Sequence, residues 1–317
     1  MNSLDTSKVT FIEVLEQDEG QRIDNFLVKK LKGVPKSRIY KMLRKGEVRV
    51  NKGRIKAEYK IVTGDQVRIP PVRMSDTQTE VPTGLKKVQM LEDCILFEDD
   101  RLIVLNKPCG MAVHGGSGMS FGVIEAMRAL RPKAPYLELV HRLDRDTSGC
   151  LLIAKKRSAL RFLHQQLQQK TMTKRYWALV NGVWPKKLQL VNAPLAKNQV
   201  QSGERLVKVD PHGKESLTSF RIIETFNEFT LVSAEPITGR THQIRVHAQH
   251  AGHGLVGDDK YGSDEINQSF KQQGLSHRLF LHAYSLKFKI QPDSKPITIE
   301  AGLPEELEQL LTHLRKI

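Results

Sequence analysis

The stretch LVHRLDRDTSGCLLIAK, residues 139–155, places a run of charged residues directly before an apolar segment. The apolar part, residues 150–154, predicts a strand. In the charged part, Asp144 lies between Arg142 and Arg145. Such a carboxylate is either part of a solvated turn or a reactive aspartate that its surroundings keep ionised. The choice depends on which other residues the fold brings to this loop.

Length and composition suit a globular protein with two domains. The chain has 317 residues, of which 39% are hydrophobic and 27% are charged. It contains no apolar run long enough to span a membrane, and its polar, acidic N-terminus does not resemble a secretory signal. The three cysteines, Cys94, Cys109 and Cys150, lack the spacing of a zinc site or a disulfide framework. We therefore expect a cytoplasmic protein.

The positive charge is concentrated in one segment. The whole chain carries a net charge of +15, and residues 20–73 hold 16 Lys and Arg against four acidic residues. Clustered positive charge binds a phosphate backbone with strong salt dependence. A solvated basic face is the alternative. A membrane surface would instead favour a basic amphipathic helix with aromatic residues on its apolar side, and no such helix is evident.

Residues 20–75 have the pattern of a small, compact module. Helices are predicted over residues 22–33, ending at Gly33, and from Pro35 to a stop at Gly46. A hairpin follows in KGEVRVNKGRIK, residues 45–56. This arrangement resembles the S4 RNA-binding domain, which implies recognition of folded RNA by shape and phosphates. Its expected contacts lie on the second helix: Lys36, Arg38, Lys41, Arg44 and Lys45.

Strands and helices alternate irregularly after residue 94. Strands are predicted at 94–108 (two, around an Asp-Asp turn), after 148, and at 174–182, 216–226 and 229–237; helices are predicted at 121–130, 158–170 and 241–252. Thr241 is the expected N-cap of the last helix, for which a strand is the competing assignment. Four parts are expected: an N-terminal extension (1–19), the S4-like domain (20–75), a linker (76–93) and a catalytic domain (94–317).

Three short motifs are too weak to define a function. HGGSG, residues 114–118, lacks the lysine of a nucleotide-binding loop and is expected to form a flexible wall of a cleft. His242 and His247 are five residues apart, which does not place them on one helical face, so no metal site is expected. DRDT, residues 144–147, matches a phosphatase nucleophile motif, but His141 and Arg142 interrupt the apolar strand that should precede it.

Three distant segments together suggest a nucleotide substrate. An arginine close to Asp144 would favour its ionised form and fix its direction. An oriented carboxylate suits covalent catalysis at a sugar carbon. An aromatic ring in the same cleft would stack on a base taken out of its helix. Tyr176 can supply that ring, and Arg240 and Arg245 can supply the positive charge.

Five motifs resemble those of the RluA-type pseudouridine synthases: QRIDNFL, NKPCGMAVHGG, HRLDRDTSG, KRYWALV and TGRTHQIRVH. The resemblance runs from about residue 20 to the C-terminus. It implies an α+β fold, with the S4-like domain followed by a mixed, mainly antiparallel sheet and a central cleft. It also implies isomerisation of uridine to pseudouridine in RNA, without metal or organic cofactor.

The resemblance assigns roles to individual residues. Asp144 corresponds to the catalytic aspartate, Tyr176 to the tyrosine beside the target uracil and Arg245 to the arginine paired with the aspartate. Arg142 corresponds to a residue that fills the gap left by the flipped base. Arg240 is a candidate phosphate contact. His141, next to Arg142, is also expected to bind RNA.

The implied partner is 23S ribosomal RNA, either naked or in an assembling large subunit, and the chain is expected to be a monomer that binds no membrane. Asp144 is expected to attack C1′ of the sugar or C6 of the base, or only to stabilise charge. Asp146 is expected to be a turn acid paired with a local arginine. The alternatives are a catalytically silent assembly factor, which would bind RNA without isomerising it, and a magnesium-dependent phosphatase.

Overall fold

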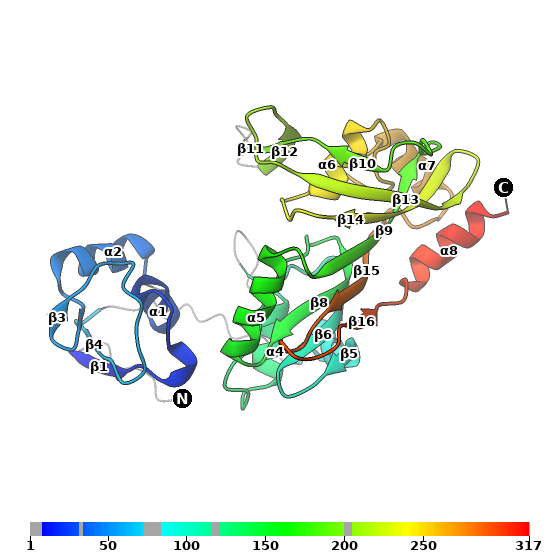
Figure 1. The fold of residues 1–317 in the computed structure, drawn as a ribbon. Coiled ribbons are helices and arrows are strands. Elements are labelled where there is room, and N and C mark those ends of the chain that lie inside the picture. The colour runs from blue at the N-terminus through cyan, green and yellow to red at the C-terminus, as the bar shows by residue number, and fades with distance from the viewer. Residues whose placement is uncertain (1–7, 32–33, 73–83, 116–120, 200–204, 317) are drawn as a thin grey trace. The chain divides into compact units, whose positions relative to one another are not determined.

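The chain divides into two units, Met1–Glu80 and Val81–Ile317, in a computed structural model (Figure 1). The structure describes residues 8–31, 34–72, 84–115, 121–199 and 205–316. The expected end of the first helix at Gly33 lies outside the described residues. None of the helices in the described part of the chain has the length and apolar character needed to cross a membrane.

The first unit packs two helices against a four-stranded sheet of order β1-β4-β2-β3. Its elements are β1 (Thr10–Glu13), the 3-10 helix η1 (Glu16–Asp18), α1 (Ile23–Lys30), α2 (Lys36–Lys45), β2 (Arg49–Val50), β3 (Gly53–Arg54) and β4 (Gln66–Ile69). Phe26 and Leu27 from α1 meet Ile39 and Met42 from α2 in a core of fully buried side chains. Gly46 ends α2 in the left-handed conformation, as its sequence position predicted.

The second unit is built on a ten-stranded mixed sheet. Its strands are β5 (Ile95–Glu98), β6 (Leu102–Lys107), β7 (Glu138–Leu139), β8 (Ser148–Ala154), β9 (Thr173–Asn181), β10 (Leu190–Asn192), β13 (Leu217–Thr225), β14 (Phe229–Pro236), β15 (Leu281–Phe288) and β16 (Ile297–Glu300). Along the main path the order is β10-β13-β14-β9-β15-β8-β6-β5. Among the described strand pairs, β8 with β15 is parallel and the others are antiparallel. The predicted α+β class and mainly antiparallel sheet are therefore confirmed.

Helices cover both faces of this sheet. They are α3 (Lys86–Asp93), α4 (Val123–Leu130), α5 (Arg157–Gln168), α6 (Gln243–His250), α7 (Asp264–Gln272) and α8 (Glu305–Leu314); a separate hairpin is formed by β11 (Leu195–Gln199) and β12 (Arg205–Val209). Strand β9 shows the two faces clearly, because Tyr176 and Ala178 point into the core that contains α4, α5 and α6, whereas Leu179 belongs to the cluster with α7 and α8. In Figure 1, α6 and α7 lie with β13 and β14, and α5 lies beside β8.

Two stretches differ from the boundaries expected from sequence. Residues 10–13, assigned to an N-terminal extension, form β1, which pairs with β4 over its whole length. The second half of the expected linker forms α3, where Val88 and Leu91 are fully buried in the core of the second unit. Their three-residue spacing is the helical signal that the mixed composition of the segment obscured.

Strand β8 lies between β15 and β6 at the centre of the sheet, and all seven of its residues are buried. Gly149 pairs with Ala283 of β15 at a φ of +107°. A Cβ atom on Gly149 would lie 2.4 Å from the Ala283 carbonyl oxygen. The glycine that follows the charged loop is therefore required by the close approach of two central strands.

We predict that Gly149→Ala lowers the free energy of unfolding by about 2 kcal/mol or more, because it combines a left-handed backbone with a backbone clash. Gly274→Ala is the matched control, since Gly274 also has a positive φ but nothing lies within 4 Å of the position that its Cβ atom would take. Urea denaturation of both variants measures the difference. Equal stability losses would show that the approach of β15 to β8 does not constrain this position.

Candidate active site

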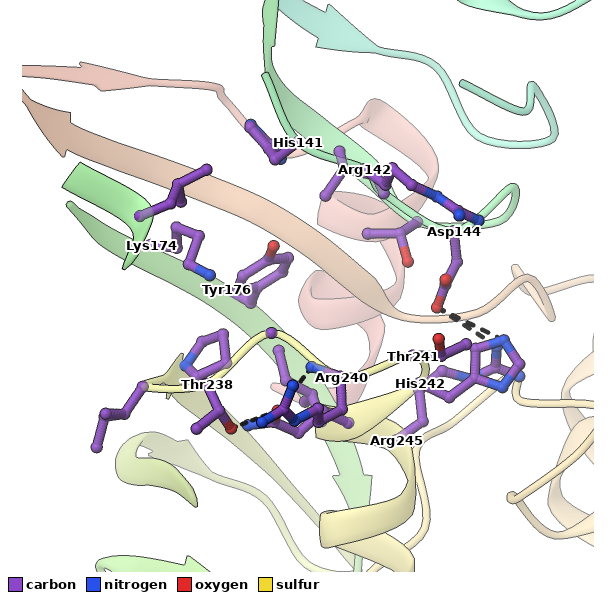
Figure 2. A pocket seen from close by; sticks show the side chains of 18 of the residues that line it. His141, Arg142, Asp144, Lys174, Tyr176, Thr238, Arg240, Thr241, His242 and Arg245 are labelled. Carbon is purple, nitrogen blue, oxygen red and sulfur yellow. Dashed lines mark hydrogen bonds and ion pairs between the residues drawn. The ribbon is translucent and has the colours of Figure 1, made fainter. Parts of the chain in front are cut away.

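A pocket of about 680 Å³ opens in the second unit (Figure 2). Its walls come from the loop between β7 and β8, the end of α5, strand β9 and the segment that joins β14 to α6. The predicted residues of the second unit all line it: His141, Arg142, Asp144, Tyr176, Arg240 and Arg245. The fold thus gathers side chains that are far apart in the sequence.

The Asp144 carboxylate faces two nitrogen groups across the pocket. Nη1 of Arg245 lies 3.8 Å from Oδ2 of Asp144, and Nε2 of His242 lies 3.9 Å from the same oxygen. The Asp144 side chain is 31% exposed, whereas those of Arg245 and His242 are 7% and 14% exposed. Asp144 therefore has the expected arginine at ion-pair distance, and its carboxylate remains accessible to a bound molecule.

A buried partner fixes the direction of Arg245. Its Nε and Nη2 each donate a hydrogen bond of 2.6 Å to Asp258, whose side chain is fully buried. Burial alone would lower the pKa of Arg245, but the hydrogen bonds and charge of Asp258 raise it above its usual value. The guanidinium is therefore permanently charged, and its remaining nitrogen points toward Asp144.

The segment that leads into α6 is shaped by Gln243. The side-chain oxygen of Gln243 accepts hydrogen bonds from the Thr238 hydroxyl and the Arg240 N–H, at 2.7 and 3.0 Å. Helix α6 starts at Gln243, so the helical assignment is confirmed and the competing strand is wrong. The predicted N-cap at Thr241 is also wrong, because His242 occupies that position, in the left-handed conformation and without a side-chain capping bond.

Lys107 holds the loop that carries Asp144. Its ammonium group is completely buried and donates to the carbonyl oxygens of Pro108, Met111 and Arg145, at 2.8, 2.8 and 3.0 Å. Burial lowers the pKa of Lys107 to about 8. Lys107, at the end of β6, is thereby joined to the loop that carries Asp144, at the carbonyl oxygen of the next residue, Arg145.

Tyr176 and Lys174 project into the pocket from the same face of β9 (Figure 2). Tyr176 is 8% exposed, and burial, reinforced by the charge of Asp144, raises its pKa. Burial lowers the pKa of Lys174. At neutral pH the tyrosine is therefore a neutral phenol, which offers an aromatic surface and a hydroxyl donor near the carboxylate.

The other predicted contacts of the second unit differ in their surroundings. Nε2 of His141 accepts a hydrogen bond from the Leu152 N–H at 3.2 Å, and burial lowers the pKa of His141 to about 3. Its neutral ring therefore also ties the loop to β8. Arg142 is exposed at the pocket, next to Asp144 in Figure 2. Arg240 is exposed, and its Nε donates to the Glu215 carbonyl at 3.1 Å.

The predicted contacts of the first unit lie on α2. Lys36, Lys41, Arg44 and Lys45 are exposed. Arg38 is half-buried and forms an ion pair of 3.1 Å with Glu47. Four of the five basic side chains are thus presented to solvent from one helix.

Two weaker sequence motifs have ordinary structural explanations. Strand β7 has only two residues, Glu138 and Leu139, so Asp144 does not follow the long apolar strand that the phosphatase motif requires. Asp146 is paired with its neighbour Arg145 at 3.0 Å, as expected of a turn acid. Of the HGGSG loop, residues 116–118 lie outside the described residues.

Sequence reasoning missed several residues around Asp144, namely Lys107, His242, Asp258 and Tyr261. Asp258 and Tyr261 belong to GDDKYG, residues 257–262. In this segment the buried Asp258 accepts a hydrogen bond from Arg245, thirteen positions earlier in the sequence. A short, glycine-bounded polar segment after a helix with functional residues is the signal that could have identified them. No feature of sequence spacing placed the ring of His242 beside Asp144.

Two family models match the chain: RNA pseudouridylate synthase over residues 101–250 and the S4 domain over residues 21–67. Ribosomal large subunit pseudouridine synthase C of Yersinia pestis is 60% identical over 309 residues, covering 97% of this chain and 96% of that protein. The protein of the same name from Escherichia coli (strain K12) is 56% identical over 313 residues, covering 98% of each chain.

Solved structures show the same architecture. Human RNA Pseudouridylate Synthase Domain Containing 4 aligns with a TM-score of 0.59 and 26% identity, covering 72% of this chain and 95% of that chain. The 56–60% identity with the bacterial relatives extends over nearly the full length of both chains. It establishes that this chain and those relatives belong to one family. The chain belongs to the RNA pseudouridylate synthase family and carries an S4 domain before its catalytic domain.

Proposed function

We propose that this protein isomerises specific uridines of large-subunit (23S) ribosomal RNA to pseudouridine, with Asp144 as the reacting carboxylate. The observation that carries the proposal is the accessible Asp144 side chain, which faces the buried, permanently charged Arg245 in a pocket that also holds Tyr176. The names of the bacterial relatives support the choice of large-subunit ribosomal RNA.

The pocket has the size and lining that a single flipped nucleotide requires. Sites for small ligands usually measure about 300–1,000 Å³, and this pocket measures about 680 Å³. A base in a helix must leave the stack before an enzyme can act on its glycosidic bond. Arg142, exposed beside Asp144, is proposed to occupy the vacated position. His141 and Arg240, at the same pocket, are proposed to bind the flanking RNA.

The reaction exchanges one bond to the sugar for another. The N1–C1′ bond breaks, the uracil rotates and C5 forms a bond with C1′. The C5 proton then leaves, and N1 gains a proton. Substrate and product are isomers, so the net reaction requires no oxidant, reductant or group donor, in keeping with the cofactor-free activity expected from sequence.

An ionised Asp144 serves each of the proposed routes. It can attack C1′ or C6 as a nucleophile, or stabilise positive charge that develops at C1′. All three use the carboxylate, and the Arg245 guanidinium faces it with an opposite charge at ion-pair distance. Tyr176 is proposed to stack on the uracil. Its raised pKa favours the neutral phenol over a role as a base.

The S4 domain is proposed to supply affinity for the RNA. Lys36, Lys41, Arg44 and Lys45 on α2 provide positive charge in the geometry of a helix face, and Arg38 adds to it despite its pairing with Glu47. Contacts of this kind bind phosphates and give register rather than base specificity. Ribosomal RNA as substrate, free or in an assembling subunit, would place the protein in the cytoplasm.

We predict that Asp144→Asn reduces turnover by about 1,000-fold or more, a loss of about 4 kcal/mol in transition-state stabilisation. RNA binding should change little, because one charge among many is removed. Release of tritium from RNA containing C5-tritiated uridine, measured in EDTA, reports the reaction directly. Asp146→Asn is the matched control and should keep turnover within a few-fold of wild type, since the Asp146 carboxylate pairs with a neighbouring exposed arginine.

Substantial turnover by Asp144→Asn would contradict the assignment of the reacting group. RNA binding by the wild-type protein without turnover on ribosomal RNA would instead favour the catalytically silent assembly factor. Turnover that stops in EDTA would favour metal-dependent chemistry.

For the S4 domain, we predict that replacing Lys36, Lys41, Arg44 and Lys45 together by Gln weakens RNA binding and flattens its dependence on salt. Removal of each phosphate-binding side chain should reduce the slope of log K against log salt by about 0.7–0.9. The control replaces Lys186, Lys187, Lys271 and Lys295 by Gln; these lysines are also exposed but lie in the second unit. Equal slopes for the two quadruple variants would show that the charge on α2 does not bind RNA specifically.

A further inference from the structure

His242 and Tyr261 form a hydrogen-bonded pair beside Asp144. Nδ1 of His242 lies 2.9 Å from the hydroxyl oxygen of Tyr261, and the two rings meet edge to face at 5.6 Å. The opposite nitrogen of the imidazole, Nε2, is the atom that lies 3.9 Å from Oδ2 of Asp144. Figure 2 shows the His242 ring directed at the Asp144 carboxylate. The two ring nitrogens therefore serve two different partners.

The surroundings of Tyr261 favour one tautomer of His242. The Tyr261 oxygen already accepts a hydrogen bond from the Val207 N–H at 2.9 Å, and its side chain is 5% exposed. The hydroxyl proton is then best directed at Nδ1 of His242, which accepts it. A neutral imidazole with an acceptor at Nδ1 carries its own proton on Nε2. That N–H points toward Asp144.

The charges that face His242 are consistent with a neutral ring. Burial lowers the pKa of His242; Arg245 and Lys260 act in the same direction, and Asp144 and Asp258 oppose it. Burial also raises the pKa of Tyr261, so its hydroxyl keeps the proton that the arrangement requires.

A purely structural role in α6 does not account for histidine at this position. His242 is the N-cap residue, yet its side chain makes no hydrogen bond to the helix. Its backbone has a φ of 52° and a ψ of 20°, the left-handed conformation that few residues other than glycine adopt. The imidazole bonds to Tyr261 instead, and strained backbone of this kind concentrates at functional sites.

We propose that His242 is a positioning residue for Asp144. The Nε2–H of His242 and the guanidinium of Arg245 together hold Oδ2 of Asp144, and the Tyr261 hydroxyl sets the tautomer of His242. Oδ1 is then the oxygen that reacts with the nucleotide. The inference rests on the proposed role of Asp144. The present distances of 3.8 and 3.9 Å exceed a hydrogen bond, and we expect them to shorten when RNA binds, as catalytic hydrogen bonds commonly do.

Tyr261 also connects this pair to Arg245. The Arg245 guanidinium lies 5.0 Å from the centre of the Tyr261 ring, and the Tyr261 N–H donates to Asp258 at 3.0 Å. Tyr261 therefore contacts both donors that face Asp144. Tyr261→Phe keeps the ring beside Arg245 and removes the hydroxyl, together with its hydrogen bonds to His242 and to the Val207 N–H.

The test compares His242→Asn with His242→Gln in the full-length protein. Asparagine tolerates the left-handed backbone but does not reach Asp144, whereas glutamine places an amide N–H near the position of the imidazole Nε2. We expect kcat to fall about 100-fold in the Asn variant, at the lower end of the loss that removal of a preorganised donor causes. KM for RNA should change less than about threefold, and His242→Gln should recover most of the lost kcat.

A second measurement uses the wild-type protein labelled with ¹⁵N-histidine, with the Tyr261→Phe variant as comparison. The ¹⁵N chemical shifts of His242, assigned by their loss in His242→Asn, should show the Nε2–H tautomer at neutral pH, and the tautomer preference should weaken in Tyr261→Phe. This readout does not depend on activity.

Three results would overturn the inference: an Nδ1–H or doubly protonated His242 in the wild-type protein, wild-type kcat in His242→Asn, or equal loss of kcat in the Asn and Gln variants at unchanged melting temperature. Failure of the proposed function would look different, because the wild-type protein would then lack turnover while the His242 tautomer remained as expected.

Discussion

The buried pair between Arg245 and Asp258 is the interaction on which the site depends. Two hydrogen bonds of 2.6 Å fix the guanidinium, and both side chains are almost inaccessible to solvent. Breaking such a pair from one side costs about 3–5 kcal/mol, because the remaining charge is left unpaired in the interior. The pair therefore holds one positive charge in a set direction, and the partly exposed Asp144 is the acid that meets its free nitrogen.

The rest of the second unit brings Asp144 to that charge. Strand β8 is fixed at the centre of the sheet by the close approach of Gly149 to β15. The loop before it is held by Lys107, which binds three carbonyl oxygens. On the opposite wall, Gln243 shapes the turn into α6. The carboxylate and its partners are thus held by separate elements around one sheet, an arrangement that preorganises charge before the substrate binds.

Much of this arrangement was accessible from sequence, for identifiable reasons. The burial of β8 follows from the unbroken apolar run after Asp144, and α2 follows from its apolar spacing and the glycine at residue 46. The motif resemblance placed Asp144, Tyr176 and Arg245 in one site, and the fold brings them to one pocket. Residues 86–93 were mistaken for linker because a short helix with only two buried side chains, Val88 and Leu91, gives a weak period.

The supporting residues were harder to predict because their function is defined by three-dimensional contacts. Asp258 lies in a glycine-bounded turn typical of a loop, and only its bonds to Arg245 give it a further role. Thr241 has the better N-cap chemistry, yet the helix starts one residue later. The Gln243 side chain secures the preceding turn, and His242 takes a left-handed backbone that turns its ring toward Tyr261. Local propensity was overridden there by the contacts of the site.

The most direct test of the central claim is to map pseudouridine in unmodified large-subunit ribosomal RNA after incubation with the wild-type protein in EDTA. Carbodiimide labelling followed by primer extension locates each modified position. If the protein is a cofactor-free synthase with Asp144 held by Arg245, stops should appear at a small number of discrete uridines and should be absent from the untreated RNA. Efficient binding of the same RNA with no new stop at any position would contradict it.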